Sequence, residues 1–211
     1  MQMPKRIRAL AFAAMAAMFA GEASALSFAF TGTFAGDDDV DLFSFTLDAP
    51  STITAITYSY AGGTQTNGNV VPAGGFDPML TLFDATGLKL ADNDDGISAP
   101  FDPDTGDAFD AELSAVLAAG AYILALTQYD NISLGDLADG FAETGNAFFT
   151  ALYGCTNGQF CDDSGDAPFN NRTSAWALDL LNVTTAVPEP ATAALLSLGL
   201  GGLGAWRRRN A

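Results

Sequence analysis

Large apolar side chains occupy every second position of Leu42-Phe43-Ser44-Phe45-Thr46-Leu47. Phe43, Phe45 and Leu47 share one face, and Ser44 and Thr46 lie on the other with Leu42. A period of two is typical of a β-strand that buries one face. Outward from this stretch, five more segments carry β-branched and aromatic side chains and are separated by Gly, Asn, Asp and Pro clusters. They are 26–34, 53–60, 79–83, 121–127 and 175–183.

Six or more short strands with turn-rich spacers predict an all-β fold, an antiparallel β-sandwich. The strands fall within 26–185, about 160 residues, which suits one domain with a sizeable core. No break in composition within this range suggests a second domain.

Five phrases in this range resemble the bacterial pre-peptidase C-terminal (PPC) domain. They are 39–45 (DVDLFSF), 76–84 (FDPMLTLFD) followed by Gly87, 90–96 (LADNDDG), 117–122 (LAAGAY) and 176–180 (WALDL). The resemblance implies a jelly-roll-like β-sandwich. The chain departs from the ordinary module in two long inserts, at 64–75 and at about 129–171.

The C-terminal part combines Val187-Pro188-Glu189-Pro190, an apolar run at 191–206, and Arg207-Arg208-Arg209. A helix of about 16 residues rises about 24 Å, a little less than a hydrocarbon core of roughly 30 Å. The three parts together resemble the PEP-CTERM sorting signal of Gram-negative bacteria. The resemblance implies a sorting signal at 187–211 with a transmembrane helix at about 191–206, cut by an exosortase near residues 187–190. A plain membrane anchor is the alternative.

The N-terminal part predicts a signal peptide at 1–25. Lys5, Arg6 and Arg8 precede an apolar run at 9–20, and Ala23-Ser24-Ala25 is a small-residue cleavage site. We therefore expect a signal helix, export by the Sec machinery and a mature protein that begins at Leu26. Because the exported chain meets an oxidising compartment, its two cysteines, Cys155 and Cys161, are predicted to form a disulfide. A two-thiol metal site is the alternative, but the chain has no histidine to complete it.

The exported body is strongly acidic. Six of the eight Lys and Arg residues lie in the two terminal segments, which leaves Lys89 and Arg172 in the body. Of the 25 acids only Glu22 and Glu189 lie outside it, so 23 acids remain and the body carries a net charge of −21. Such a surface repels nucleic acid and attracts cations. Divalent cations are the expected partners, and adaptation to a saline habitat is the alternative explanation.

Calcium needs six to eight oxygen ligands on a flexible, Gly-containing loop. Two stretches offer carboxylates in that context, 92–96 and 102–107. The candidate calcium ligands are Asp92, Asp94, Asp95, Asp102, Asp104 and Asp107. Neither stretch completes an EF-hand loop. Asp37, Asp38, Asp39 and Asp41 are further candidates, because adjoining carboxylates repel one another unless a cation lies among them. A third candidate group, beside the cysteines, is formed by Asp162, Asp163 and Asp166. Solvated turn aspartates are the alternative, since aspartate favours turns.

Catalysis finds little support in the sequence. Without histidine there is no Ser-His-Asp or Cys-His arrangement. Pairs of carboxylates are inevitable among so many aspartates, and so they do not indicate a glycosidase. We therefore predict no catalytic residues, no cofactor other than calcium and no enzymatic activity, with a carboxylate-based secreted hydrolase as the remaining alternative.

The sequence thus predicts an exosortase-sorted protein of a Gram-negative bacterium. It would pass transiently through the inner membrane to the cell surface or extracellular matrix. The expected role is structural or adhesive, in exopolysaccharide or biofilm, with extracellular polysaccharide as a partner. The alternative is a carbohydrate- or protein-binding module that uses aromatic side chains of the 129–171 insert, because exposed rings stack on sugars and peptides.

Overall fold

The computed structural model describes residues 25–162 and 170–188. Most of the predicted signal peptide, including Ala23, lies outside the described residues. So do the predicted transmembrane helix at 191–206 and the sorting residues Glu189, Pro190 and Arg207 to Arg209. No helix within the described ranges is long and apolar enough to cross a membrane.

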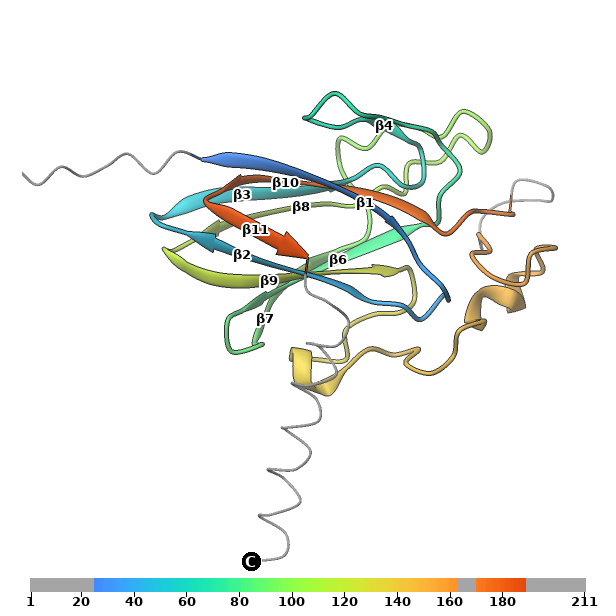
Figure 1. Cartoon of the computed structure of the whole chain (residues 1–211). Coiled ribbons are helices and arrows are strands. Elements are labelled where there is room, and N and C mark those ends of the chain that lie inside the picture. Colours follow the sequence, from blue (N-terminus) through green and yellow to red (C-terminus); the bar gives the residue numbers. More distant parts are fainter. Residues whose placement is uncertain (1–24, 163–169, 189–211) are drawn as a thin grey trace, which may run out of the picture.

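Two antiparallel sheets face each other (Figure 1). The four-stranded sheet has the order β1 (Leu26–Thr33), β10 (Ala175–Val183), β3 (Ser51–Thr57), β8 (Glu112–Leu117). The five-stranded sheet has the order β11 (Thr185–Pro188), β2 (Asp41–Leu47), β9 (Gly120–Gln128), β6 (Pro78–Asp84), β7 (Lys89–Asn93). The short strands β4 (Gly63–Thr64) and β5 (Val70–Val71) pair separately. Two 3₁₀ turns, η1 (Leu137–Asp139) and η2 (Phe149–Tyr153), lie in the long insert.

The predicted antiparallel β-sandwich is confirmed. Except for the β6–β7 and β4–β5 hairpins, successive strands alternate between the two sheets. The resulting order, with β1-β10-β3-β8 opposite β2-β9-β6-β7, is that of a jelly roll, with β11 added beside β2. All six predicted strands are present with ends shifted by a few residues, and the structure adds β4, β5, β7, β8 and β11.

The alternation along β2 places Phe43, Phe45 and Leu47 in the core between the sheets. Leu80, Leu124 and Leu178 complete the same layer from β6, β9 and β10, and none of these three is exposed to solvent. Burial of such side chains contributes about 1.5–3 kcal/mol each. The core therefore holds the two sheets together without ionic contacts.

Parts of the two inserts pack on the outer faces of the sandwich, on opposite sides of it (Figure 1). On the five-stranded sheet, Phe141 packs with Leu42, Phe83 and Ala125 in a second apolar cluster. On the four-stranded sheet, the Gln65 side chain donates hydrogen bonds to the main-chain oxygens of Phe30 and Leu178. The Phe141 cluster on the five-stranded sheet explains why β6 is buried on both faces, although an antiparallel strand commonly has one face in contact with water.

Candidate functional site

Arg172 is the centre of a buried polar network at one end of the sandwich. Its guanidinium donates to a carboxylate oxygen of Asp102 at 2.8 Å, and to the main-chain oxygens of Tyr60 and Gly75 at 2.7 and 2.9 Å. It also lies over the Tyr60 ring, 3.7 Å from the centroid. The side chains of Arg172 and Asp102 are only 4% and 1% exposed. Sequence reasoning missed this network, because its members are far apart in the chain.

Asp110 is a second buried carboxylate at the same end of the sandwich. Its carboxylate accepts hydrogen bonds from the main-chain N–H groups of Ser59, Tyr60 and Ala61 and from the Thr57 hydroxyl. Burial raises the pKa of Asp110, and these donors oppose the rise. The Tyr60 hydroxyl in turn donates to Asp162, and burial together with this bond raises the pKa of Tyr60. The arrangement fixes the loop after β3 and does not leave a reactive group exposed.

The predicted calcium ligands lie in two different environments. Asp92 is on strand β7, not in a loop, and forms a partly exposed ion pair with Lys89 at 3.3 Å. Asp102 is engaged by Arg172 and also accepts from the N–H groups of Asp104 and Thr105. The side chains of Asp94, Asp95, Asp104 and Asp107 are exposed or half-buried. Within residues 25–162 and 170–188, no group of three or more His, Cys, Asp or Glu side chains is arranged to hold a metal ion.

The acidic run at 37–39 binds main-chain groups. Asp37 is fully buried and accepts from the N–H groups of Thr150 and Phe160 at 2.9 and 2.7 Å, and from the Thr150 hydroxyl. Asp38 accepts from Gly145, and Asp39 accepts from Gly36 at 3.1 Å. Repulsion among the three carboxylates is thus offset by N–H donors, and Asp37 fastens the long insert to the sandwich.

The predicted disulfide between Cys155 and Cys161 is present, with Cα atoms 5.4 Å apart. It closes the insert segment that Asp37 holds. Three of the insert's phenylalanines, Phe141, Phe149 and Phe160, are buried, so they are not available to a ligand. Phe148 and Leu152 are 62% and 74% exposed on and beside η2.

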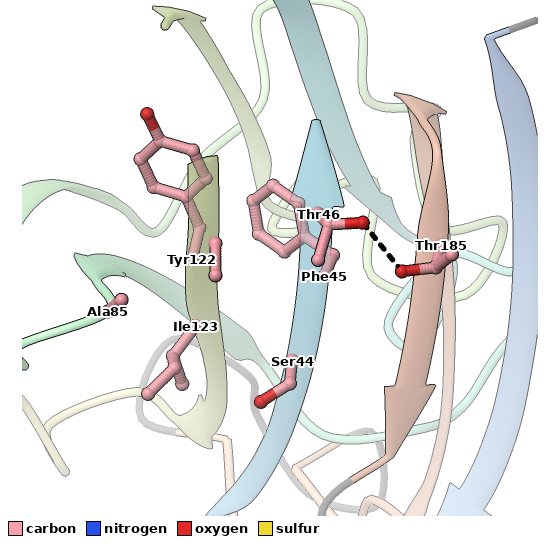
Figure 2. Close-up of a pocket in the computed structure, with 8 residues that line it drawn as sticks. Ser44, Phe45, Thr46, Ala85, Tyr122, Ile123 and Thr185 are labelled. Atoms are coloured by element: carbon pink, nitrogen blue, oxygen red, sulfur yellow. Dashed lines mark hydrogen bonds between the residues drawn. The ribbon is translucent and has the colours of Figure 1, made fainter. Parts of the chain in front are cut away.

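Strand β11 lies at the edge of the five-stranded sheet and pairs only with β2. Thr185 is opposite Thr46, Ala186 opposite Phe45, Val187 opposite Ser44 and Pro188 opposite Phe43. The hydroxyls of Thr46 and Thr185 are 2.7 Å apart (Figure 2). Pro188, which has no N–H to donate, ends this edge strand, a position that suits proline. Val187 and Pro188 of the predicted sorting segment are therefore also paired in this sheet.

Beside β11 the outer face of the sheet has an open hollow of about 330 Å³ (Figure 2). Small and hydroxylic residues line much of it: Ser44, Thr46, Ala85, Ala121 and Thr185. Ile123 supplies apolar surface next to them. No charged side chain is among the residues that line this hollow.

Fold and tail together define a class of protein, an antiparallel β-sandwich with a C-terminal sorting segment. Residues 186–209 match the family model of the PEP-CTERM protein-sorting motif. The motif indicates an exported, membrane-transiting protein of a Gram-negative bacterium that an exosortase processes. No curated protein matches the chain. The first three residues of the matched range are Ala186, Val187 and Pro188 of β11.

Proposed function

We propose that this chain is a non-enzymatic, exported protein with a structural or adhesive role in the exopolysaccharide or biofilm of its cell. One observation carries the proposal: the sorting motif begins in the last strand of an acidic sandwich, and part of that sandwich is covered by its own inserts. A signal peptide at 1–25 would start export through Sec. A transmembrane helix at about 191–206 would hold the precursor in the inner membrane. We also propose that the body is related to the PPC domain.

The acidic surface supports a matrix role through cation bridging. A body with a charge of −21 repels anionic polysaccharide unless cations lie between them. Asp102 is engaged by Arg172, and Asp92 by Lys89. Of the six candidate calcium ligands, those without an ion-pair partner among the described residues are therefore Asp94, Asp95, Asp104 and Asp107. In the proposed mechanism, calcium neutralises these loops and links the protein to the polymer.

Localisation tests the proposal. The full chain and a chain that ends at Pro188 are expressed in a Gram-negative host with an exosortase, and both are followed by fractionation. We expect the full chain to reach the surface and matrix fraction and the shortened chain to stay in the periplasm. Chelation with EDTA should release the full chain from the matrix, whereas magnesium at the same ionic strength should not restore retention as calcium does. Equal distribution of the two chains would refute sorting.

The exposed side chains on and beside η2 favour a second candidate function, a binding module. Phe148 and Leu152 offer apolar surface next to the disulfide-closed segment. Glycan and peptide arrays with residues 26–188 test it, because exposed aromatic rings contribute to recognition of sugars. Phe148→Ala should abolish any hit, and Val70→Ala, at a residue that is 73% exposed on the other insert, is the matched control. Arrays without a hit would leave the structural role.

A further inference from the structure

The sorting motif begins inside the folded body, without a spacer. Val183 ends β10 in the four-stranded sheet, and Thr185 begins β11 in the other sheet, so Thr184 alone joins the two. The Thr184 N–H donates to the Thr46 oxygen at 2.8 Å, and its hydroxyl accepts from the Asp48 N–H at 3.0 Å. The chain is therefore fastened on β2 just before the motif starts at residue 186.

Pairing of β11 with β2 competes with binding of β11 by an enzyme, because both use main-chain groups of β11. A peptide segment that is recognised in an extended conformation makes main-chain hydrogen bonds with the protein that binds it. In β11 about half of these groups face β2, as in any antiparallel edge strand, and Ala186 packs against the core, so an enzyme that encloses the segment cannot reach all of it in place. An exosortase that engages the start of the motif must therefore take β11 from β2.

We propose that β11 is a releasable strand, and that the exosortase acts on the motif only after β11 has left β2. The inference rests on the proposed processing by an exosortase. An edge strand of four residues with one neighbour opens more readily than the central strands, because local opening costs less where few contacts are broken. Folding of the body thus limits the rate of processing through the fraction of chains with β11 open.

A disulfide across the strand pair provides the test. Thr46 and Thr185 are direct partners with facing hydroxyls, and both lie outside the matched range 186–209. The double variant Thr46→Cys/Thr185→Cys should lock β11 in the oxidising periplasm and leave every residue of the motif unchanged. Thr54 and Ser114 are partners on the other sheet with hydroxyls 2.9 Å apart, so Thr54→Cys/Ser114→Cys is the matched control lock.

Processing of the full chain is followed by pulse-chase in a host with the exosortase, with and without reductant. We expect the β11 lock to slow cleavage at least tenfold, reductant to restore it, and the control lock to match the wild type. Equal cleavage of both locked chains would overturn the inference. If the wild type itself is not cut, or is cut equally in a host without exosortase, the proposed function fails instead.

A second variant does not depend on forming a disulfide. Thr185→Ala removes the hydroxyl contact across β2 and β11, so it should raise the open fraction and speed cleavage severalfold. Thr54→Ala removes the equivalent contact on the other sheet and should leave the cleavage rate unchanged. Identical rates for these two single variants would likewise refute release of β11 as the limiting step.

Discussion

At the scale of single residues, Arg172 and Asp102 show how an acidic protein uses a scarce cation. Each charge is buried and has its partner at 2.8 Å, and Arg172 also binds two carbonyl oxygens. A buried ion pair adds little net stability over an apolar pair, but loss of one partner leaves an uncompensated buried charge. Arg172 is therefore important chiefly because its loss would leave the buried Asp102 carboxylate without its ion-pair partner.

We predict that Arg172→Met lowers the free energy of unfolding by about 3–5 kcal/mol. The reason is the unpaired Asp102 carboxylate together with the lost stacking on Tyr60. Lys89→Met is the control, because its ion pair with Asp92 is exposed and is expected to contribute less than about 1 kcal/mol. Urea denaturation of residues 26–188 measures both. Similar losses for the two variants would contradict a special role for the buried pair.

The same pair predicts a pH dependence. Burial alone would raise the pKa of Asp102, but the bond from Arg172 and the main-chain donors of Thr105 and Asp104 together lower that pKa below 3.8. A lowered pKa in the folded state stabilises the fold above 3.8, and the contribution is lost as pH falls through the folded value. In Arg172→Met the pKa of the buried Asp102 should instead rise.

The stability gap between wild type and Arg172→Met should therefore be full at neutral pH and close as pH falls through the range around 3.8. Urea denaturation in steps between about pH 3 and pH 7 measures this gap. A gap that stays constant over this range would show that the Asp102 charge is not its cause.

At the scale of elements, the long insert is held by few but buried contacts. Asp37 at the turn before β2 fastens the segment that contains η2 and the disulfide. Phe160 joins the main core from the same segment. Together with the Tyr60–Asp162 bond and the Phe141 cluster, these contacts attach the insert to the sandwich.

We predict that Asp37→Asn loosens residues 148–161 by about 2 kcal/mol, because one acceptor oxygen and the charge are lost while the N–H donors stay buried. Limited proteolysis should then cut this segment at least tenfold faster. Asp38→Asn is the milder control, since the Asp38 carboxylate forms an exposed hydrogen bond with Gly145. Unchanged cleavage of Asp37→Asn would show that the rings alone hold the insert.

At the scale of the whole molecule, the excess of negative charge acts against compactness. The body has 23 acids and two bases, and its self-repulsion is reduced by salt. Screening by salt is independent of any specific site, whereas a bound ion adds stability according to its concentration and affinity. The two effects separate when ionic strength is held constant.

We predict that sodium chloride raises the melting temperature of residues 26–188, and that calcium at matched ionic strength raises it by several degrees more. A ligand at about 100 times its Kd adds about 2.7 kcal/mol, and each kcal/mol shifts the melting temperature of a domain of this size by about 2–4 °C. Magnesium is the control ion. The variant Asp94→Asn/Asp104→Asn should lose the calcium increment, and an equal shift with calcium and magnesium would remove calcium from the proposal.

The sequence predicted what local periodicity encodes. β2, β3 and β10 carry alternating or β-branched patterns over seven to nine residues, and all were expected. β7 was assigned to an acidic loop, because Asp92 and Asn93 disfavour strands locally, whereas pairing with β6 overrides that preference. β11 was not predicted: Thr185 was expected to end the body and Val187 and Pro188 to belong to the sorting signal, because so short a segment forms a strand only through its pairing with β2.

Predictions for the polar residues were weaker for a physical reason. The adjacent aspartates at 37–39 suggested a cation, but the Asp37 carboxylate accepts hydrogen bonds from main-chain N–H groups that only the folded chain brings near. The partners of Arg172 at Asp102 and Tyr60 are 70 and 112 residues away in the chain. No spacing rule connects such residues, so their network was not predicted.

The end of β11 at Pro188 also fixes how far the sandwich can lie from the membrane in the precursor. In the proposed precursor, only Glu189 and Pro190 would lie between the end of β11 and a transmembrane helix at 191–206, so this linker would span about 10 Å at full extension. With so short a linker, the sandwich of the proposed precursor would not turn freely above the bilayer. It would present the same sheet edge to the lipid surface until the cut frees it, so membrane partners would meet one orientation of this protein.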